Sequence, residues 1–183
     1  MSSQGRVLRI YRDGRRHEKV LTRQLPVGAK ANLETLLVMK QIVNEDAKET
    51  DIKNFVFREI IGLDKKTLPA QIEAAYRFCQ KQIKYESEAD GFETVCDLWS
   101  ALYRKSYPAG DCSIKSVSLA TCLSYLGLKQ EFVAVQQIPN AKFYNHVFLC
   151  CFLDGKRIYL DPTPDRFNVG DKLPSFNRLH LPI

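Results

Sequence analysis

Residues 110–128, Gly-Asp-Cys-Ser-Ile-Lys-Ser-Val-Ser-Leu-Ala-Thr-Cys-Leu-Ser-Tyr-Leu-Gly-Leu, decide the fold. The apolar residues of this stretch spread over most of the circumference of a helix. This pattern predicts a helix from Cys112 to Leu126 that is buried on several sides and ended by Gly127. Asp111 is placed to be its N-cap, accepting from the amides of Ser113 or Ile114.

Cys112 begins this helix, which is a favourable place for a nucleophilic thiol. A helix start supplies a positive dipole end and free backbone N–H groups. If the Asp111 side chain turns toward the helix amides, the amide of Cys112 is left to face a substrate oxyanion. The negative charge of Asp111 acts in the opposite sense, because it disfavours a neighbouring thiolate.

Downstream of this helix the chain predicts three strands, near Glu131 to Ile138, Asn145 to Leu153 and Lys156 to Leu160. The dipeptide Asp154-Gly155 is typical of a two-residue hairpin turn, which would pair residue 153 with 156 and place Phe148 opposite Asp161. Asp161 would then lie diagonal to His146 on the same face of the sheet, within reach of its imidazole.

Cys112, His146 and Asp161 thus follow the order nucleophile, base and orienting carboxylate. Each residue alone has an ordinary structural explanation. A free cysteine is commonly buried, a strand histidine is commonly a satisfied core side chain, and an aspartate before proline is commonly a turn residue. The three together, at positions that share a face, favour a catalytic triad.

The chain resembles the transglutaminase-like, papain-related superfamily over roughly residues 70 to 165. The resemblance rests on Gly110-Asp111-Cys112 with its apolar helix, Asn145-His146-Val147-Phe148, and Leu160-Asp161-Pro162-Thr163. It implies an α+β fold in which N-terminal helices and a buried cysteine-bearing helix pack on an antiparallel sheet. It also implies a thiol-dependent hydrolase or acyl transferase that attacks amide or peptide bonds through a thioester. Cys112 would be the nucleophile, His146 the acid/base and Asp161 the orienting group, with no metal or cofactor.

The family also has an upstream residue that supports the oxyanion, for which Trp99 and Tyr107 are the candidates here. Short Gly-Asp-Cys variants of this core resemble proteins from prophage regions, which suggests a virion-associated role. The family further includes members without catalysis. A non-catalytic interaction module, using a basic N-terminal segment for binding, is therefore the alternative function.

The rest of the chain predicts a single domain over residues 1–183, with residues 1–28 a basic hairpin or extension. The hairpin would run from Val7-Tyr11 through Asp13-Gly14 and back through Lys19-Leu21. Three helices are expected at about residues 32–43, 51–61 and 69–83, with a polar loop at 85–92 and a short helix at 93–104. The tail beyond Asp161 is expected to be mostly irregular, with His180 exposed there and His17 exposed in the hairpin.

Of the formal charge of +6, +5 lies before residue 24, where seven Lys or Arg face Asp13 and Glu18. This basic segment predicts an acidic partner or nucleic acid as one alternative, and an ordinary soluble strand edge as the other. The basic residues are Arg6, Arg9, Arg12, Arg15, Arg16, Lys19 and Arg23.

The six cysteines match neither a zinc site nor a disulfide framework, which favours a reducing, cytoplasmic setting. The five apart from Cys112 are expected in the core, as is Trp99. No apolar stretch is long enough for a membrane span, and no targeting signal is visible. Peptide or protein is the expected substrate, and the sequence leaves the oligomeric state open.

Overall fold

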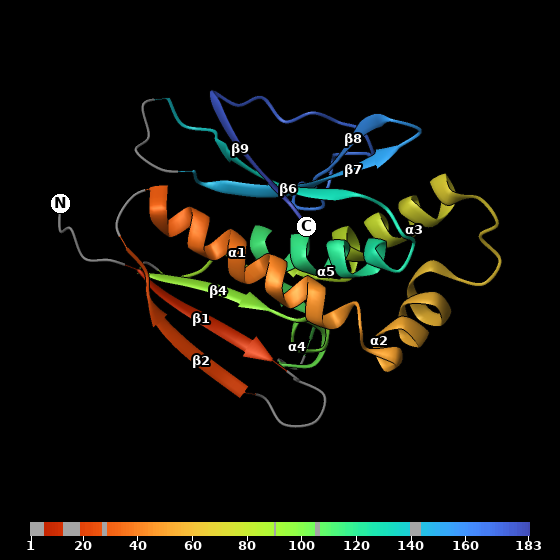
Figure 1. Cartoon of the computed structure of the whole chain (residues 1–183), viewed down its shortest axis with the longest axis horizontal. Coiled ribbons are helices and arrows are strands. Elements are labelled where there is room, and N and C mark those ends of the chain that lie inside the picture. The colour runs from red at the N-terminus through yellow and green to blue at the C-terminus, as the bar shows by residue number, and fades with distance from the viewer. Residues whose placement is uncertain (1–5, 13–18, 27–28, 90, 105–106, 140–143) are drawn as a thin grey trace.

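The computed structural model describes residues 6–12, 19–26, 29–89, 91–104, 107–139 and 144–183. Two sheets enclose a layer of helices, so that the fold is α+β with three layers (Figure 1). The predicted Asp13-Gly14 turn and His17 lie outside the described residues. Within the described residues no helix is long and apolar enough to cross a bilayer.

The four-stranded sheet is antiparallel, in the order β8-β7-β6-β9. Its strands are β6 (Gln130–Gln136), β7 (His146–Leu153), β8 (Lys156–Leu160) and β9 (Asn177–Pro182). Leu153 pairs with Lys156 and Leu149 with Leu160, which confirms the register predicted from Asp154-Gly155. Asp154 has φ 51° and Gly155 has φ 74°, the left-handed conformation that this hairpin turn requires.

The helical layer contains α1 (Ala29–Asp46), α3 (Leu68–Lys81) and α5 (Cys112–Ser124). Every residue of α5 from Ser113 to Leu123 is buried, as its apolar circumference predicted, because α5 lies between the two sheets (Figure 1). At one end of the layer, α2 (Thr50–Phe55) runs directly into a π-helical turn, η1 (Val56–Ile61). The short helix α4 (Leu98–Tyr103) begins at its N-cap Asp97.

The second sheet has the order β2-β1-β4. Strands β1 (Val7–Arg12) and β2 (Lys19–Gln24) pair antiparallel, and β1 pairs in parallel with β4 (Phe92–Cys96). The prediction of a helix at 93–104 is therefore wrong for its first part. The reason is that β4 gains its backbone hydrogen bonds from β1, far away in the sequence, and local periodicity carries no signal of such a partner.

Two further differences from the sequence prediction have the same cause. The expected loop at 85–92 begins inside β3 (Lys84–Tyr85), which pairs with β5 (Ala109–Gly110). The expected irregular tail ends in β9, whose backbone pairs with β6 along its length. His180 on β9 is bonded to Glu131 at 2.9 Å and is partly buried, so the prediction of an exposed His180 is wrong.

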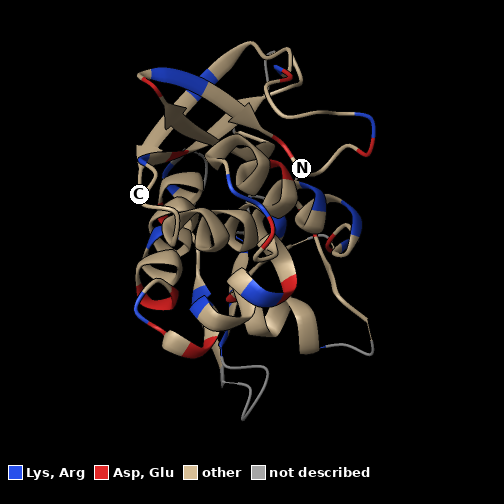
Figure 2. Cartoon of the chain, turned by 90° about the vertical axis from the view of Figure 1, so that its right-hand side faces the viewer, with Lys and Arg blue, Asp and Glu red and all other residues tan. Residues whose placement is uncertain are grey.

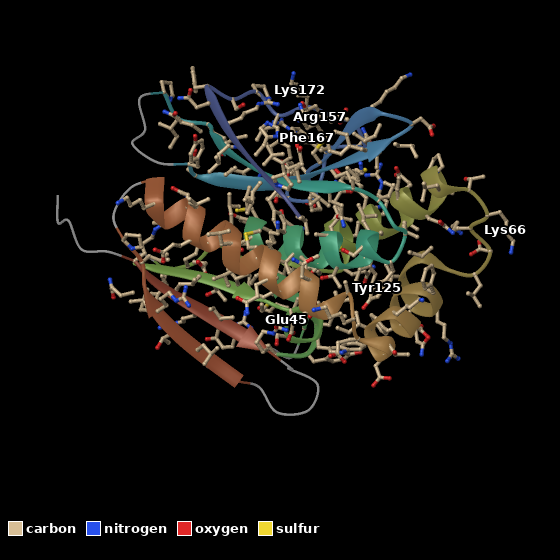
Figure 3. The ribbon with its side chains drawn as sticks, in the orientation of Figure 1. Glu45, Lys66, Tyr125, Arg157, Phe167 and Lys172 are labelled. Atoms are coloured by element: carbon tan, nitrogen blue, oxygen red, sulfur yellow. The ribbon has the colours of Figure 1, made fainter. Side chains whose placement is uncertain are left out.

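The segment from Pro162 to Phe176 first passes α3, where the carbonyl of Phe167 accepts from Tyr76 at 3.1 Å, and then crosses the outer face of the four-stranded sheet; Figure 3 labels Phe167 and Lys172 in this segment. Leu173 and Tyr159 cover a small apolar cluster there, formed by Val133, Val135, Phe148 and Cys150. The main core lies on the inner side, around α5. Cys79, Cys96, Cys122, Cys150 and Cys151 are all buried and free, and Trp99 is buried between Phe55 and Tyr103, as expected.

A buried acidic cluster joins the second sheet to the helices at the end of α1. The carboxylate of Asp46 accepts from the Leu98 amide at 3.3 Å and from the Thr121 hydroxyl at 3.2 Å. Arg12 lies between Asp46 and Asp97, at 3.7 and 3.4 Å, and also pairs with Glu45 at 2.8 Å. The hydroxyl of Tyr125 donates to the carbonyl of Asp46 (Figure 3). Burial, followed by the charge of Asp97, raises the pKa of Asp46 to about 7.

The raised pKa of Asp46 predicts a pH-dependent stability. Between about pH 4 and pH 7 the folded protein holds a proton at Asp46 that the unfolded chain releases, so the free energy of unfolding falls as the pH rises through this range. Asp46→Asn removes this contribution and is expected to flatten the fall, as measured by urea unfolding at pH 4.5 and 7.5. Asp64→Asn, at an exposed carboxylate, is the control, and parallel curves for wild type and Asp46→Asn would contradict the assignment.

Candidate active site

A cavity of about 280 Å³ opens at the start of α5, and both Cys112 and His146 line it. Its walls come from α1, from β4 and the loop before it, from the first turn of α5, and from the start of β7. Cys112 is partly exposed there, unlike the five buried cysteines. The cavity therefore brings the predicted nucleophile and base, which are 34 residues apart in sequence, to one surface.

The start of α5 is built as the sequence predicted. The carboxylate of Asp111 accepts from the amides of Ser113 and Ile114, at 3.0 and 3.1 Å. The first amides of a helix have no intrahelical partner, and this cap does not use the amide of Cys112. Gly110 is required by close approach, because a Cβ atom at this position would lie 2.4 Å from a side-chain carbon of Ile114.

The surroundings of Cys112 favour the neutral thiol over the thiolate. Burial raises its pKa well above the usual range, and the charges of Asp111 and Glu93 raise it further. A hydrogen bond from the backbone N–H of Val147 acts in the opposite direction and ties the sulfur to β7, next to His146. An ionised sulfur at this place therefore requires a base that takes its proton.

His146 can act as this base, because Asp161 binds only one of the two ring nitrogens and leaves the other available. The Nε2 atom lies 2.7 Å from Oδ2 of Asp161, which is buried. A carboxylate only accepts hydrogen bonds, so Nε2 carries the hydrogen and Nδ1 is the basic nitrogen of the neutral ring. The remaining oxygen of Asp161 accepts from the amide of Thr163 at 3.1 Å, the local turn bond that an aspartate before proline was expected to make.

Side chains from two helices donate hydrogen bonds to the backbone around Asp161. Tyr76 on α3 donates its hydroxyl to the carbonyl of Asp161 at 2.8 Å. Lys115 on α5 donates its ammonium to the carbonyl of Pro162 at 3.1 Å. The element that carries Cys112 is thus bonded directly to the turn that carries Asp161.

Sequence analysis missed Tyr85, which also lines the cavity. Strand β3 places it beside Gly110, two residues before Cys112, and its side chain is half exposed. Burial and the neighbouring Cys112 raise the pKa of Tyr85, so its hydroxyl remains a hydrogen-bond donor at neutral pH. The two candidates named from sequence, Trp99 and Tyr107, are not among the cavity's lining residues. Trp99 packs in the core, and Tyr107 donates to Glu86 at 2.5 Å.

Three carboxyl groups give the cavity an acidic wall. One oxygen from each of Glu88, Glu93 and Asp111 lies within 4.8 Å of the others. Glu93 is bonded to the Ser113 hydroxyl at 2.9 Å and to Arg6 at 3.0 Å, and Asp111 caps α5. Burial raises the pKa of both Glu93 and Asp111. Both oxygens of Glu93 and one oxygen of Asp111 are thus already engaged in hydrogen bonds within the protein.

Three arginines of the basic N-terminal segment contact the rest of the chain. Arg6 pairs with Glu93, Arg12 pairs with Glu45, and the guanidinium of Arg9 lies 3.7 Å from the centre of the Phe92 ring. Arg15 and Arg16 lie outside the described residues, and Arg23 is exposed on the edge strand β2. Binding of an acidic partner or nucleic acid by this segment stays a prediction.

No protein-family profile and no curated protein matches the chain. Among solved structures, the fold resembles a protein from Parabacteroides distasonis whose description reads "putative protease", with a TM-score of 0.54 and 14% identity over 80% of this chain and 29% of that one. It also matches a "putative cysteine protease" from Cytophaga hutchinsonii, with a TM-score of 0.43 and 11% identity over 74% of this chain and 56% of that one.

This chain spans less than two thirds of the length of either structure. At these identities the first likeness shows the fold alone. Neither comparison supports the predicted prophage origin.

Asp111 acts in two ways, as the N-cap of α5 and as a negative charge next to the thiol of Cys112. Two substitutions distinguish these effects. Asp111→Asn keeps a capping side chain but removes the charge, so the pKa of Cys112 is expected to fall with little change in stability. Asp111→Ala removes the cap as well and is expected to lower the free energy of unfolding by about 1 kcal/mol. The pH dependence of iodoacetamide alkylation measures the thiol, and urea unfolding measures the cap. An unchanged thiol pKa in Asp111→Asn would contradict the electrostatic role.

Proposed function

We propose that this protein is a transglutaminase-like, papain-related cysteine hydrolase that cleaves amide or peptide bonds through a thioester. The carrying observation is the 2.7 Å contact of Asp161 with His146, which lines the same cavity as Cys112. The packing of a buried, cysteine-bearing helix on an antiparallel sheet supports the papain-like assignment.

In the proposed acylation step, Nδ1 of His146 takes the thiol proton of Cys112 as the sulfur attacks the substrate carbonyl carbon. A carbon–sulfur bond forms and the carbonyl electrons move to oxygen. When the tetrahedral intermediate collapses, the carbon–nitrogen bond breaks and His146 gives its proton to the leaving amine. The product is a thioester on Cys112 and a free amine.

In the second step, His146 takes a proton from water, and the resulting hydroxide attacks the thioester. Collapse of that intermediate breaks the carbon–sulfur bond, releases the acid and returns the proton to the sulfur. Asp161 holds the ring through Nε2 and stabilises the imidazolium formed in each step. An amine in place of water would give acyl transfer.

The oxyanion formed in both steps needs donors beside the sulfur. The amide of Cys112, which the Asp111 cap leaves unused, is one. We assign the phenol of Tyr85 as the second, because it lines the same cavity and stays protonated at neutral pH. In this assignment a residue 27 positions before the cysteine takes the role for which Trp99 and Tyr107 were the candidates.

Thiol reactivity tests the base. Alkylation of Cys112 by iodoacetamide near neutral pH, followed by peptide mass spectrometry, is expected to slow about 10-fold to 100-fold in His146→Gln. His180→Gln is the matched control, because His180 is also bonded to a carboxylate but lies on the remote strand β9. Equal rates in wild type and His146→Gln would favour the non-catalytic interaction module.

A different reagent tests the oxyanion donor. Reaction of Cys112 with p-nitrophenyl acetate passes through an oxyanion, whereas alkylation by iodoacetamide does not. Tyr85→Phe is therefore expected to slow acetylation about 100-fold and to leave alkylation unchanged. Tyr103→Phe, at another half-exposed tyrosine outside the cavity lining, is the control. Equal slowing of both reactions in Tyr85→Phe would point to a disturbed cavity and against an oxyanion role.

A further inference from the structure

A second cavity shares Tyr85 with the cavity that holds Cys112. It has a volume of about 790 Å³ and is formed by the end of α3, by β3, by α5 and by the turn after Asp161. Tyr85 lines both this cavity and the one that holds Cys112. We call the cavity that holds Cys112 the thiol cavity and the larger cavity the lysine cavity. A substrate that crosses Tyr85 would contact both.

The two cavities carry opposite charge. The thiol cavity has Arg6 against Glu88, Glu93 and Asp111. The lysine cavity has Lys81, Lys84 and Lys115 against Asp165 alone. Among the described residues, none of these three ammonium groups lies within ion-pair distance of a carboxylate, and Lys84 faces the Tyr107 ring at 5.1 Å. The positive charge of the lysine cavity is therefore only partly compensated within the protein.

The wall of the lysine cavity contains a buried lysine, Lys115. Its side chain is 1% exposed, and its ammonium donates to two backbone carbonyls, Gln80 at 2.9 Å and Pro162 at 3.1 Å. A buried charge without an ionic partner is held at a free-energy cost that a bound counter-ion reduces. Burial lowers the pKa of Lys115, while the charges of Asp165 and Asp161 oppose this shift. The fixed ammonium in the wall and the exposed Lys81 and Lys84 at the mouth favour an anionic group in the cavity.

We propose that the lysine cavity binds a carboxylate of the substrate, so that the enzyme prefers acyl compounds with a carboxylate on the Tyr85 side of the reacting carbonyl. The inference rests on the proposed function, because the second cavity matters only if Cys112 is the nucleophile. The carboxylate belongs either to an acidic side chain or to a peptide C-terminus, and both present the same chemistry to Lys84 and Lys81.

Peptide reagents that alkylate Cys112 test the preference directly. Bromoacetyl-triglycine is compared with its C-terminal amide, and bromoacetyl-Gly-Glu-amide with bromoacetyl-Gly-Gln-amide. Each pair differs only in charge, and the two pairs distinguish a terminal carboxylate from a side-chain carboxylate. In wild type we expect the charged reagent of at least one pair to alkylate Cys112 about fivefold faster than its uncharged counterpart. We expect this gap in rate to narrow at high salt.

The double variant Lys81→Gln/Lys84→Gln, which leaves Lys115 in place, is expected to slow the charged reagent of the preferred pair and so to narrow the gap in rate between it and its uncharged counterpart in the same variant. Lys66→Gln is the matched control, since Lys66 is an exposed lysine in the loop before α3, away from both cavities (Figure 3).

Alkylation that depends on His146 but is equally fast for charged and uncharged reagents would overturn the carboxylate subsite and leave the thiol chemistry intact. An unchanged ratio of charged to uncharged alkylation rates in the double variant would also overturn the carboxylate subsite. Failure of every reagent to modify Cys112 would remove the proposed function and this inference together.

Discussion

The burial of helix α5 is the constraint on which the rest of the structure depends. Its residues from Ser113 to Leu123 have no solvent face, so the polar groups on the helix depend on partners within the protein, and among them only the Ser118 hydroxyl is recorded as a buried atom without one. Asp111 satisfies the first amides, Lys115 reaches the carbonyls of Gln80 and Pro162, and Thr121 reaches Asp46. These bonds fix the helix against α1, α3 and the turn that follows β8. Cys112 at the helix start is thereby placed against β7 without any loop that could shift it.

The sequence is sufficient for the part of the site that local rules govern. A helix cap depends on residues two and three positions away, which is why the bonds of Asp111 could be predicted. A two-residue hairpin fixes register by counting, which is why the pairing of β7 with β8 could be predicted from Asp154-Gly155. With the register fixed, His146 and Asp161 had to share a face, and their 2.7 Å contact lies where counting places it.

The remaining part depends on partners distant along the chain. Tyr85 belongs to a two-residue strand that exists only because Gly110 and its neighbour pair with it, and two residues carry no periodicity. The acidic wall of the thiol cavity is likewise assembled from β4, the loop before it and the N-cap of α5, and Arg6, just before β1, pairs with Glu93 there. Figure 2 shows Lys, Arg, Asp and Glu interspersed over the helical side of the molecule. A count of basic residues near the N-terminus therefore says little about where positive charge is available, because the partners of Arg6 and Arg12 come from elements far away in sequence.

The parallel pairing of β1 with β4 also affects how the protein folds. Val7 pairs with Phe92, so the chain between them, including α1, η1 and α3, has to close into a long loop before β1 and β4 can pair. Loop closure of this length is an entropic barrier that local helix formation does not lower, and non-local pairing of this kind slows folding. Arg6 and Glu93 come from the two ends of that loop, and both line the space in front of Cys112. The surroundings of the sulfur therefore depend on closing that loop, and a chain in which the loop is open would carry the same cysteine without Arg6 and Glu93 in front of it.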